Sequence, residues 1–246
     1  MPAMQMNGCG ASAVSGTPTC ACSRISPEEN RISGSRLRRN PGRDSYTIKN
    51  FPRGSKTVAN LPPPQPVVGF VPMTTDLQDV KLAIFDIDGT LTEIKPEVLA
   101  RHLDMVTPNH LGEQQPMPGV VERLAELRHT GVKFALATNR GGVAWGYNSL
   151  EESEEVAREA AELCGIPDTP IFLCPYHAKA RGPKAVAEYA ADHECRKPNP
   201  GMLFQAIEDA GVGPQETIYV GDMDTDEEAA ENAGVMFYWA EDFFKR

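Results

Sequence analysis

The chain has 246 residues, 41% of them hydrophobic and 24% charged, a composition that fits one ordinary globular domain with a tail. No apolar run approaches the roughly 18 residues that a membrane-spanning helix needs, so we expect no membrane span. The net charge of -10 argues against a dominant surface for nucleic acid or for a membrane.

The first 78 residues differ from the rest in composition. They are rich in Ser, Gly, Pro, Asn and Arg and lack hydrophobic periodicity, so residues 1–78 are predicted to be a disordered basic extension before a domain at residues 79–246. The stretch Leu61–Pro66 is a predicted polyproline linker. Three interpretations of the extension stay open: an organelle transit peptide, an arm that binds nucleic acid, or a dispensable stretch before a natural protein start at Met73.

The six cysteines divide equally between the extension and the body of the chain: Cys9, Cys20, Cys22, Cys164, Cys174 and Cys195. No secretory hydrophobic segment precedes them. A reduced, cytoplasmic setting is therefore favoured over a disulfide framework.

From residue 80 onward, short apolar stretches alternate with helical patterns. The first predicted strand is Val80–Phe85. A helix follows that has Pro118 in its first turn and stops at Gly131, because proline suits the start of a helix and glycine its end. The second predicted strand is Val132–Ala137.

The next helix begins with a capping-box pattern, Ser149 with Glu152 three residues later, and closes at Gly165. The remaining predicted elements, in chain order, are a strand at Pro170–Cys174, a helix from Pro200 to Gly211, a strand at Thr217–Gly221, a helix from Asp224 to Gly234 and a short strand at Val235–Trp239. Near-continuous apolar strands are typical of parallel strands covered on both faces. The alternation predicts an α/β fold with a Rossmann-like, doubly wound parallel sheet.

Polar side chains follow three of these strands at their carboxyl ends, where open α/β sheets bind ligands. Asp86 and Asp88 end the first strand, Thr138 follows the second, and Asp222 follows the strand at 217–221. Because residues two apart on a strand share a face, Asp86 and Asp88 are expected to point into one site, roughly 6–7 Å apart by rise. Several carboxylates in a small space need a cation, and their hard oxygen ligands suit Mg²⁺ best.

The same region carries groups that suit a phosphate. Thr138 offers a hydroxyl, the turn at residues 139–142 offers close backbone N–H groups, and Lys197 supplies a positive charge. Each motif alone is a common turn, helix cap or loop, but the whole set in this order at strand ends makes coincidence a poor explanation.

Four stretches then resemble the motifs of the haloacid dehalogenase (HAD) superfamily of phosphatases: DIDGT at Asp86–Thr90, ATN with Thr138, Lys197, and GDMDTD at Gly221–Asp226. The likeness covers about residues 80–240. The pairing of TNRGGVAWG with CRKPNPGM is similar to the subfamily IIIA-like branch, which holds histidinol-phosphate phosphatases, heptose-bisphosphate phosphatases and polynucleotide 3′-phosphatases.

This resemblance implies the chemistry of the carboxylates. Asp86 would be the nucleophile that forms an aspartyl phosphate. Asp88 would be the general acid that protonates the leaving alcohol and then the base that activates water. Mg²⁺ would bind the carboxylate of Asp86, the backbone carbonyl of Asp88 and the carboxylate of Asp222.

The resemblance also implies how the phosphoryl group is held. The residues expected to hold its oxygens are Thr138, Asn139, Arg196 and Lys197. Asp226 would orient Lys197 or a metal-bound water, and Gly89 would let the backbone approach the phosphate closely.

Substrate choice in this superfamily depends on cap insertions. Only about 25 residues separate Thr92 from the helix near Pro118, too few for a full helical cap domain. The interval from Thr138 to Lys197 is used up by a helix, a strand and a loop. An essentially capless domain is therefore expected, with an open site for substrates that bring their own bulk or for small ones covered by short loops.

Two departures from the branch stand out. Arg140 occupies a position where its members commonly have Gln, and a cation there suits either a second anionic group on the substrate or a surface salt bridge. Several relatives also carry a zinc-binding loop, for which the candidate ligands here are Cys174, His177, His193 and Cys195. These four residues form either a structural Zn²⁺ site or a degenerate loop with a buried cysteine and two surface histidines.

The sequence thus predicts a cytoplasmic, Mg²⁺-dependent phosphomonoester hydrolase whose substrate is a small-molecule phosphate ester, a sugar or amino-alcohol phosphate. The alternative enzyme is a polynucleotide 3′-phosphatase, which the basic extension favours and the acidic body opposes. A non-catalytic phosphate-sensing or interaction module is the alternative of another class, and the intact set Asp86, Asp88, Lys197 and Asp222 opposes it.

Overall fold

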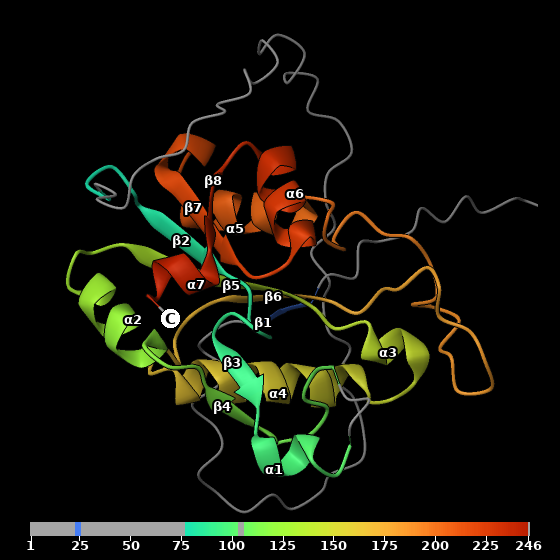
Figure 1. Ribbon diagram of the computed structural model, residues 1–246. Coiled ribbons are helices and arrows are strands. Elements are labelled where there is room, and N and C mark those ends of the chain that lie inside the picture. Colours follow the sequence, from blue (N-terminus) through green and yellow to red (C-terminus); the bar gives the residue numbers. More distant parts are fainter. Residues whose placement is uncertain (1–22, 26–76, 103–105, 246) are drawn as a thin grey trace, which may run out of the picture. The chain divides into compact units, whose positions relative to one another are not determined.

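The computed structural model describes residues 23–25, 77–102 and 106–245 (Figure 1). Six strands form one sheet in the order β1-β6-β5-β2-β7-β8. Their bounds are β1 Ser23–Ile25, β2 Leu82–Phe85, β5 Lys133–Asn139, β6 Ile171–Cys174, β7 Thr217–Gly221 and β8 Met236–Trp239. All pairs among β2, β5, β6, β7 and β8 are parallel, which confirms the predicted sheet, and β1 pairs antiparallel with β6.

Helices cover both faces of this sheet (Figure 1). On one face α2 (Val120–Arg128), α4 (Leu150–Leu163) and α7 (Ala240–Phe243) enclose the main apolar cluster. On the other face lie α5 (Gly201–Ala210) and α6 (Asp224–Ala233). Because both faces are covered, β2, β6 and β7 are buried at every position, as their continuous apolar sequences require.

The end of β2 is fixed by aromatic packing. Phe85, the last residue of β2, is fully buried and meets Phe134 and Phe243 edge-on, with ring centroids 5.6 and 6.0 Å away. Burying a phenylalanine side chain stabilises a fold by about 1.5–3 kcal/mol. Since Asp86 directly follows, this packing also fixes the position of the first predicted catalytic residue.

The four predicted helices are present, with shifted ends. The helix expected from Pro118 begins at Val120, because Gly119 before it takes a left-handed conformation with φ 79°. The helices expected to stop at Gly211 and Gly234 do so, each with the glycine left-handed at the cap. None of the helices in the described ranges is long and apolar enough to cross a membrane.

A short insertion between β2 and α2 was not predicted in its details. It contains the antiparallel hairpin of β3 (Thr92–Ile94) and β4 (Gln114–Pro116) and the four-residue helix α1 (Pro96–Leu99). The Gln114 amide accepts a hydrogen bond from the Thr92 hydroxyl (3.0 Å) and donates to the Val156 carbonyl of α4 (2.7 Å). The described part of this insertion forms no separate cap domain, as predicted.

The prediction of disorder through residue 78 is wrong at Ser23–Ile25, which form β1 at the edge of the sheet. A three-residue strand has no periodicity of its own, and pairing with the edge of β6 supplies its hydrogen bonds. The rest of the extension up to residue 76, including the predicted linker Leu61–Pro66, lies outside the described residues.

The start of α4 follows the predicted capping box. The Ser149 hydroxyl accepts a hydrogen bond from the backbone N–H of Glu152 at 3.0 Å, and the Glu152 carboxylate accepts one from the backbone N–H of Ser149 at 2.7 Å. Two backbone donors that the helix leaves unpaired are thereby satisfied.

Replacing Ser149 by alanine is expected to lower the free energy of unfolding by about 1 kcal/mol, because the Glu152 N–H loses its acceptor. Urea denaturation measures the change. Glu155→Ala, an exposed position later in α4, is the control and should leave the midpoint almost unchanged. Equal stability of the two variants would contradict the capping role.

Candidate active site

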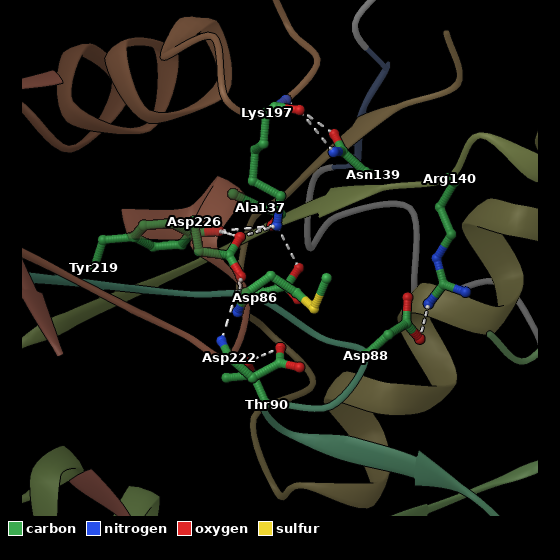
Figure 2. A network of polar contacts seen from close by, with 11 residues as sticks. Asp86, Asp88, Thr90, Ala137, Asn139, Arg140, Lys197, Tyr219, Asp222 and Asp226 are labelled. Atoms are coloured by element: carbon green, nitrogen blue, oxygen red, sulfur yellow. Dashed lines mark hydrogen bonds and ion pairs between the residues drawn. The ribbon is translucent and has the colours of Figure 1, made fainter. Parts of the chain in front are cut away.

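Three adjacent strands bring their carboxyl ends to one edge of the sheet. Phe85 of β2 pairs with Leu136 of β5 and Val220 of β7, so the residues that follow lie at the same level. Asp86 and Asp222 therefore come together at this edge (Figure 2), and the Thr138 side chain lies beside Asp88. Thr138 is buried there, and its hydroxyl faces the Asp88 carboxylate.

Lys197 reaches the same edge from the loop before α5. The Asn139 side chain holds its backbone, accepting from the Lys197 N–H at 3.1 Å and donating to its carbonyl at 3.2 Å. Asn139 was expected to bind phosphate, but its side chain is used to anchor this loop. The sequence separation of 58 residues between the two hid this contact.

The Lys197 ammonium lies in a buried network of polar groups (Figure 2). The side chain is 5% exposed and donates to Asp86 Oδ1 at 2.6 Å, to the Tyr219 hydroxyl at 2.9 Å and to the Ala137 carbonyl at 3.1 Å. It also forms an ion pair with Asp226 Oδ1 at 2.7 Å. Sequence analysis placed Asp226 near Lys197 but missed Tyr219, because a tyrosine in an apolar strand is usually part of the core.

Asp222 is held on the opposite side of Asp86. The Thr90 hydroxyl donates to Asp222 Oδ1 at 2.9 Å. A Cβ added at Gly89, where φ is 83°, would lie 2.3 Å from Asp222 Oδ2. Glycine at position 89 therefore leaves room for the Asp222 carboxylate. The sequence predicted only that this glycine lets the backbone approach a phosphate.

The charges of this cluster favour a cation. Oxygen atoms of Asp86, Asp222 and Asp226 lie within 4.8 Å of one another, and three ionised carboxylates beside one ammonium would leave two negative charges in excess. Burial, opposed in part by Lys197, raises the pKa of Asp86 to about 8, and burial also raises the pKa of Asp222. A divalent cation with oxygen ligands fits this set, because it would offset the excess charge.

The Lys197 ammonium stays charged in this setting. Burial lowers its pKa, but the carboxylates of Asp86 and Asp226 together outweigh burial and hold the pKa of Lys197 above its ordinary value. The site therefore keeps one fixed positive charge facing Asp86.

Asp88 points away from this cluster toward Arg140 (Figure 2). Arg140 is 3% exposed, lies 3.1 Å from Asp88 Oδ1 through Nη2, and donates through Nη1 to the Pro108 carbonyl of the insertion at 3.1 Å. The predicted alternative of a surface salt bridge at Arg140 is wrong, because the pair is buried. Burial raises the pKa of Asp88, and Arg140 opposes that shift.

A cavity of about 520 Å³ adjoins the site at Asn139. Helix α3 (Gly142–Trp145) and the residues after it line one side, where the rings of Trp145 and Tyr147 stack at 6.3 Å. Arg196 and His177 line another side. Arg196, predicted to bind phosphate, therefore faces this cavity and donates to the Tyr176 carbonyl at 2.9 Å.

The predicted four-residue zinc set is not formed, because two of its cysteines are joined to each other and one of its histidines lies elsewhere. Ligand atoms of Cys174, His193 and Cys195 lie within 4.8 Å of one another, but His177 packs edge-on against Trp145 instead. Cys174 and Cys195 form a disulfide, contrary to the predicted reduced cysteines. Folding brings the end of β6 beside the loop before Lys197, a contact that the spacing of 21 residues does not reveal. The cytoplasmic setting stays a prediction.

The chain is similar to a family of hydrolases over the region that carries this site. The model of the haloacid dehalogenase-like hydrolase family matches residues 109–234. A D-glycero-beta-D-manno-heptose-1,7-bisphosphate 7-phosphatase from Pasteurella multocida is 34% identical over 161 residues, which are 63% of this chain and 79% of that protein. A protein of the same name from Haemophilus influenzae is 31% identical over 163 residues, covering 63% and 78%.

A solved structure gives the same result for the fold. A protein from Mesorhizobium loti, named for its likeness to HAD phosphatases, aligns with a TM-score of 0.52 and 28% identity. The alignment covers 63% of this chain and 69% of that one.

Arg140→Gln is expected to lower the free energy of unfolding by about 3 kcal/mol near neutral pH, because Asp88 is left buried without its cation. The substitution raises the pKa of Asp88 further above its unfolded value, so the folded state binds more protons and stability falls as the pH rises. The loss in the free energy of unfolding should therefore be larger at pH 8 than at pH 5. Chemical denaturation at both pH values measures it.

The matched control is Arg158→Gln, which removes the partly exposed i,i+4 pair with Glu154 and should cost less than about 1 kcal/mol. A loss for Arg140→Gln that equals this control, or that is larger at pH 5, would show that the pair with Asp88 does not stabilise the fold.

Proposed function

This chain belongs to the haloacid dehalogenase-like hydrolase family and is a phosphatase, and on that premise we propose that it hydrolyses a small sugar phosphate through an aspartyl phosphate on Asp86. The observation that carries the proposal is the buried cluster in which Asp86 faces the ammonium of Lys197 beside two further carboxylates. A phosphoryl group entering this edge meets a nucleophile, a fixed cation and the Thr138 hydroxyl within one small space.

The first half of the proposed reaction transfers the phosphoryl group to the enzyme. The Asp86 carboxylate attacks phosphorus, and the bond from phosphorus to the leaving oxygen breaks. Asp88 gives its proton to that oxygen, so the alcohol leaves neutral. Lys197 and the Thr138 hydroxyl bind the phosphoryl oxygens while charge builds on them.

The second half returns the enzyme to its starting state. Water attacks the phosphorus of the aspartyl phosphate, and Asp88 takes a proton from that water. The bond between phosphorus and the Asp86 oxygen breaks, which releases inorganic phosphate and restores the carboxylate. The contact with Arg140 keeps Asp88 directed from one side through both halves, and it is an ion pair whenever Asp88 is ionised.

We propose Mg²⁺ as the cofactor, held by the carboxylates of Asp86 and Asp222 and the backbone carbonyl of Asp88, where it offsets repulsion between carboxylate and phosphate. The pKa of about 8 for Asp86 describes the cluster of protein groups alone. A neighbouring cation favours the ionised form, which is the form that attacks. Asp226 already contacts Lys197 and Tyr219, so we propose that it orients Lys197 and does not bind the metal directly.

The cavity beside Asn139 supports a sugar as the leaving group. The flat faces of Trp145 and Tyr147 suit the apolar side of a sugar ring, and Arg196 suits a further anionic group. The relatives are named for a heptose 1,7-bisphosphate, a molecule with both features. We therefore propose a sugar bisphosphate of this class as the first substrate to test.

The polynucleotide 3′-phosphatase remains the alternative enzyme, with the basic extension as its support. The extension lies outside the described residues except at Ser23–Ile25. We propose residues 79–246 as the catalytic domain, because the site residues all lie in that range. Comparing the full chain with residues 73–246 on a 3′-phosphorylated oligonucleotide tests both proposals.

Asp86→Asn is expected to lower kcat by more than about a thousandfold, because an amide cannot form the acyl phosphate. Hydrolysis of an aryl phosphate with Mg²⁺ measures the loss. The control is Asp224→Asn, an exposed acid at the start of α6, which should keep its activity. An Asp86→Asn enzyme that still turned over the aryl phosphate would rule out the aspartyl phosphate.

Trp145→Ala is expected to raise KM for a heptose bisphosphate about tenfold and to leave KM for the small acyl phosphate acetyl phosphate unchanged, because only the sugar reaches the cavity. Phe204→Ala, an exposed aromatic on α5, is the control. If Trp145→Ala raised KM equally for both substrates, the cavity would not be part of the substrate-binding site.

A further inference from the structure

Tyr219 places a hydroxyl in the interior of the sheet. It is the middle residue of β7, is 0% exposed, and lies between Ile218 and Val220, which face the apolar cluster under α2, α4 and α7. Because side chains alternate along a strand, Tyr219 points to the opposite face, toward Lys197. A buried hydroxyl destabilises a fold unless it is hydrogen-bonded, so the Tyr219 hydroxyl needs partners on this face of the sheet.

Both hydrogen-bonding functions of the Tyr219 hydroxyl are used (Figure 2). It donates to Asp226 Oδ1 at 2.8 Å and accepts from Lys197 Nζ at 2.9 Å. The hydroxyl thus lies between the two charged groups and bonds to each.

The ammonium of Lys197 has three N–H donors. Ala137 and Tyr219 take two, which leaves the third directed at Asp86 Oδ1. The ammonium also lies 2.7 Å from Asp226 Oδ1, so four oxygen atoms share its three donors. Removing the Tyr219 oxygen would take away one of these four oxygen atoms and free one donor of the ammonium.

Asp226 is itself held only in part by the backbone. It is the third residue of α6, and its Oδ2 accepts from the N–H groups of Met223 at 3.1 Å and Asp222 at 3.3 Å. Its Oδ1 is shared between the Tyr219 hydroxyl and Lys197. The hydroxyl therefore links Asp226 to the same ammonium that Asp226 contacts directly.

We propose that Tyr219 is a positioning residue whose hydroxyl holds the Lys197 ammonium in place facing Asp86, where the phosphoryl oxygens bind. Tyr219 touches neither substrate nor cofactor and acts through Lys197. The inference rests on the proposed function in one respect, since it takes Lys197 to bind the phosphoryl group.

The test is Tyr219→Phe, which removes the hydroxyl and keeps the buried ring. We expect kcat to fall about ten- to a hundredfold while KM changes less than about threefold, since the hydrogen bond lost is to a charged group. Tyr238→Phe is the matched control, because its hydroxyl contacts Met236 on the edge strand β8 and should leave kcat unchanged. If Tyr219→Phe behaves like this control, the proposal is overturned.

A binding measurement separates this inference from the proposed function. Orthovanadate adopts the five-coordinate geometry of a phosphoryl group in transfer, and calorimetry with Mg²⁺ measures its affinity without turnover. We expect Tyr219→Phe to weaken vanadate binding about tenfold and Tyr238→Phe to leave it unchanged. Should the wild-type chain bind vanadate yet hydrolyse no ester, the proposed function fails and this comparison still decides the role of Tyr219.

A double-mutant cycle guards against a simple loss of folding. The fold-losses of vanadate affinity caused by Asp226→Asn and by Tyr219→Phe should not multiply in the double variant. Both substitutions act on Lys197 through one shared oxygen, Asp226 Oδ1. Independent, multiplicative effects would overturn the proposal, whatever the stability of each variant.

Discussion

The buried ammonium of Lys197 is the group on which the rest of the site depends. A charge in the interior of a protein is stable only when it is paired and its donors are hydrogen-bonded. Asp86 and Asp226 supply the opposite charge, while Ala137 and Tyr219 complete the donors. In return, the ammonium allows carboxylates to lie close together at the end of a buried strand, which their mutual repulsion would otherwise prevent.

This arrangement places demands on parts of the chain that carry no chemistry. The packing of Phe85 fixes the end of β2, and glycine at 89 leaves space for Asp222. Gly221 has the same function on β7, because a Cβ there would lie 2.4 Å from the Cβ of Asp226. Close approach of the strand ends therefore explains residues that a list of catalytic groups would leave out.

Much of the fold and of the site could be predicted because the signals were local. Asp86 and Asp222 follow apolar strands directly, and parallel strands end at one edge. The hairpin of β3 and β4, and β1, were missed because strands of three residues are too short to show a period. The disulfide was missed because its two cysteines meet only through the pairing of distant segments.

The sequence by itself determined the class of the fold, the family and the carboxylates at the strand ends, since each depends on neighbouring residues along the chain. Only the tertiary structure decided what those residues touch. It turned Asp88 toward a buried Arg140, used Asn139 to anchor the backbone of Lys197, and placed the hydroxyl of Tyr219 between two charges. The physical reason is that hydrogen bonds and ion pairs depend on distance in space, and these partners lie far apart in the chain or point in directions that no sequence pattern specifies.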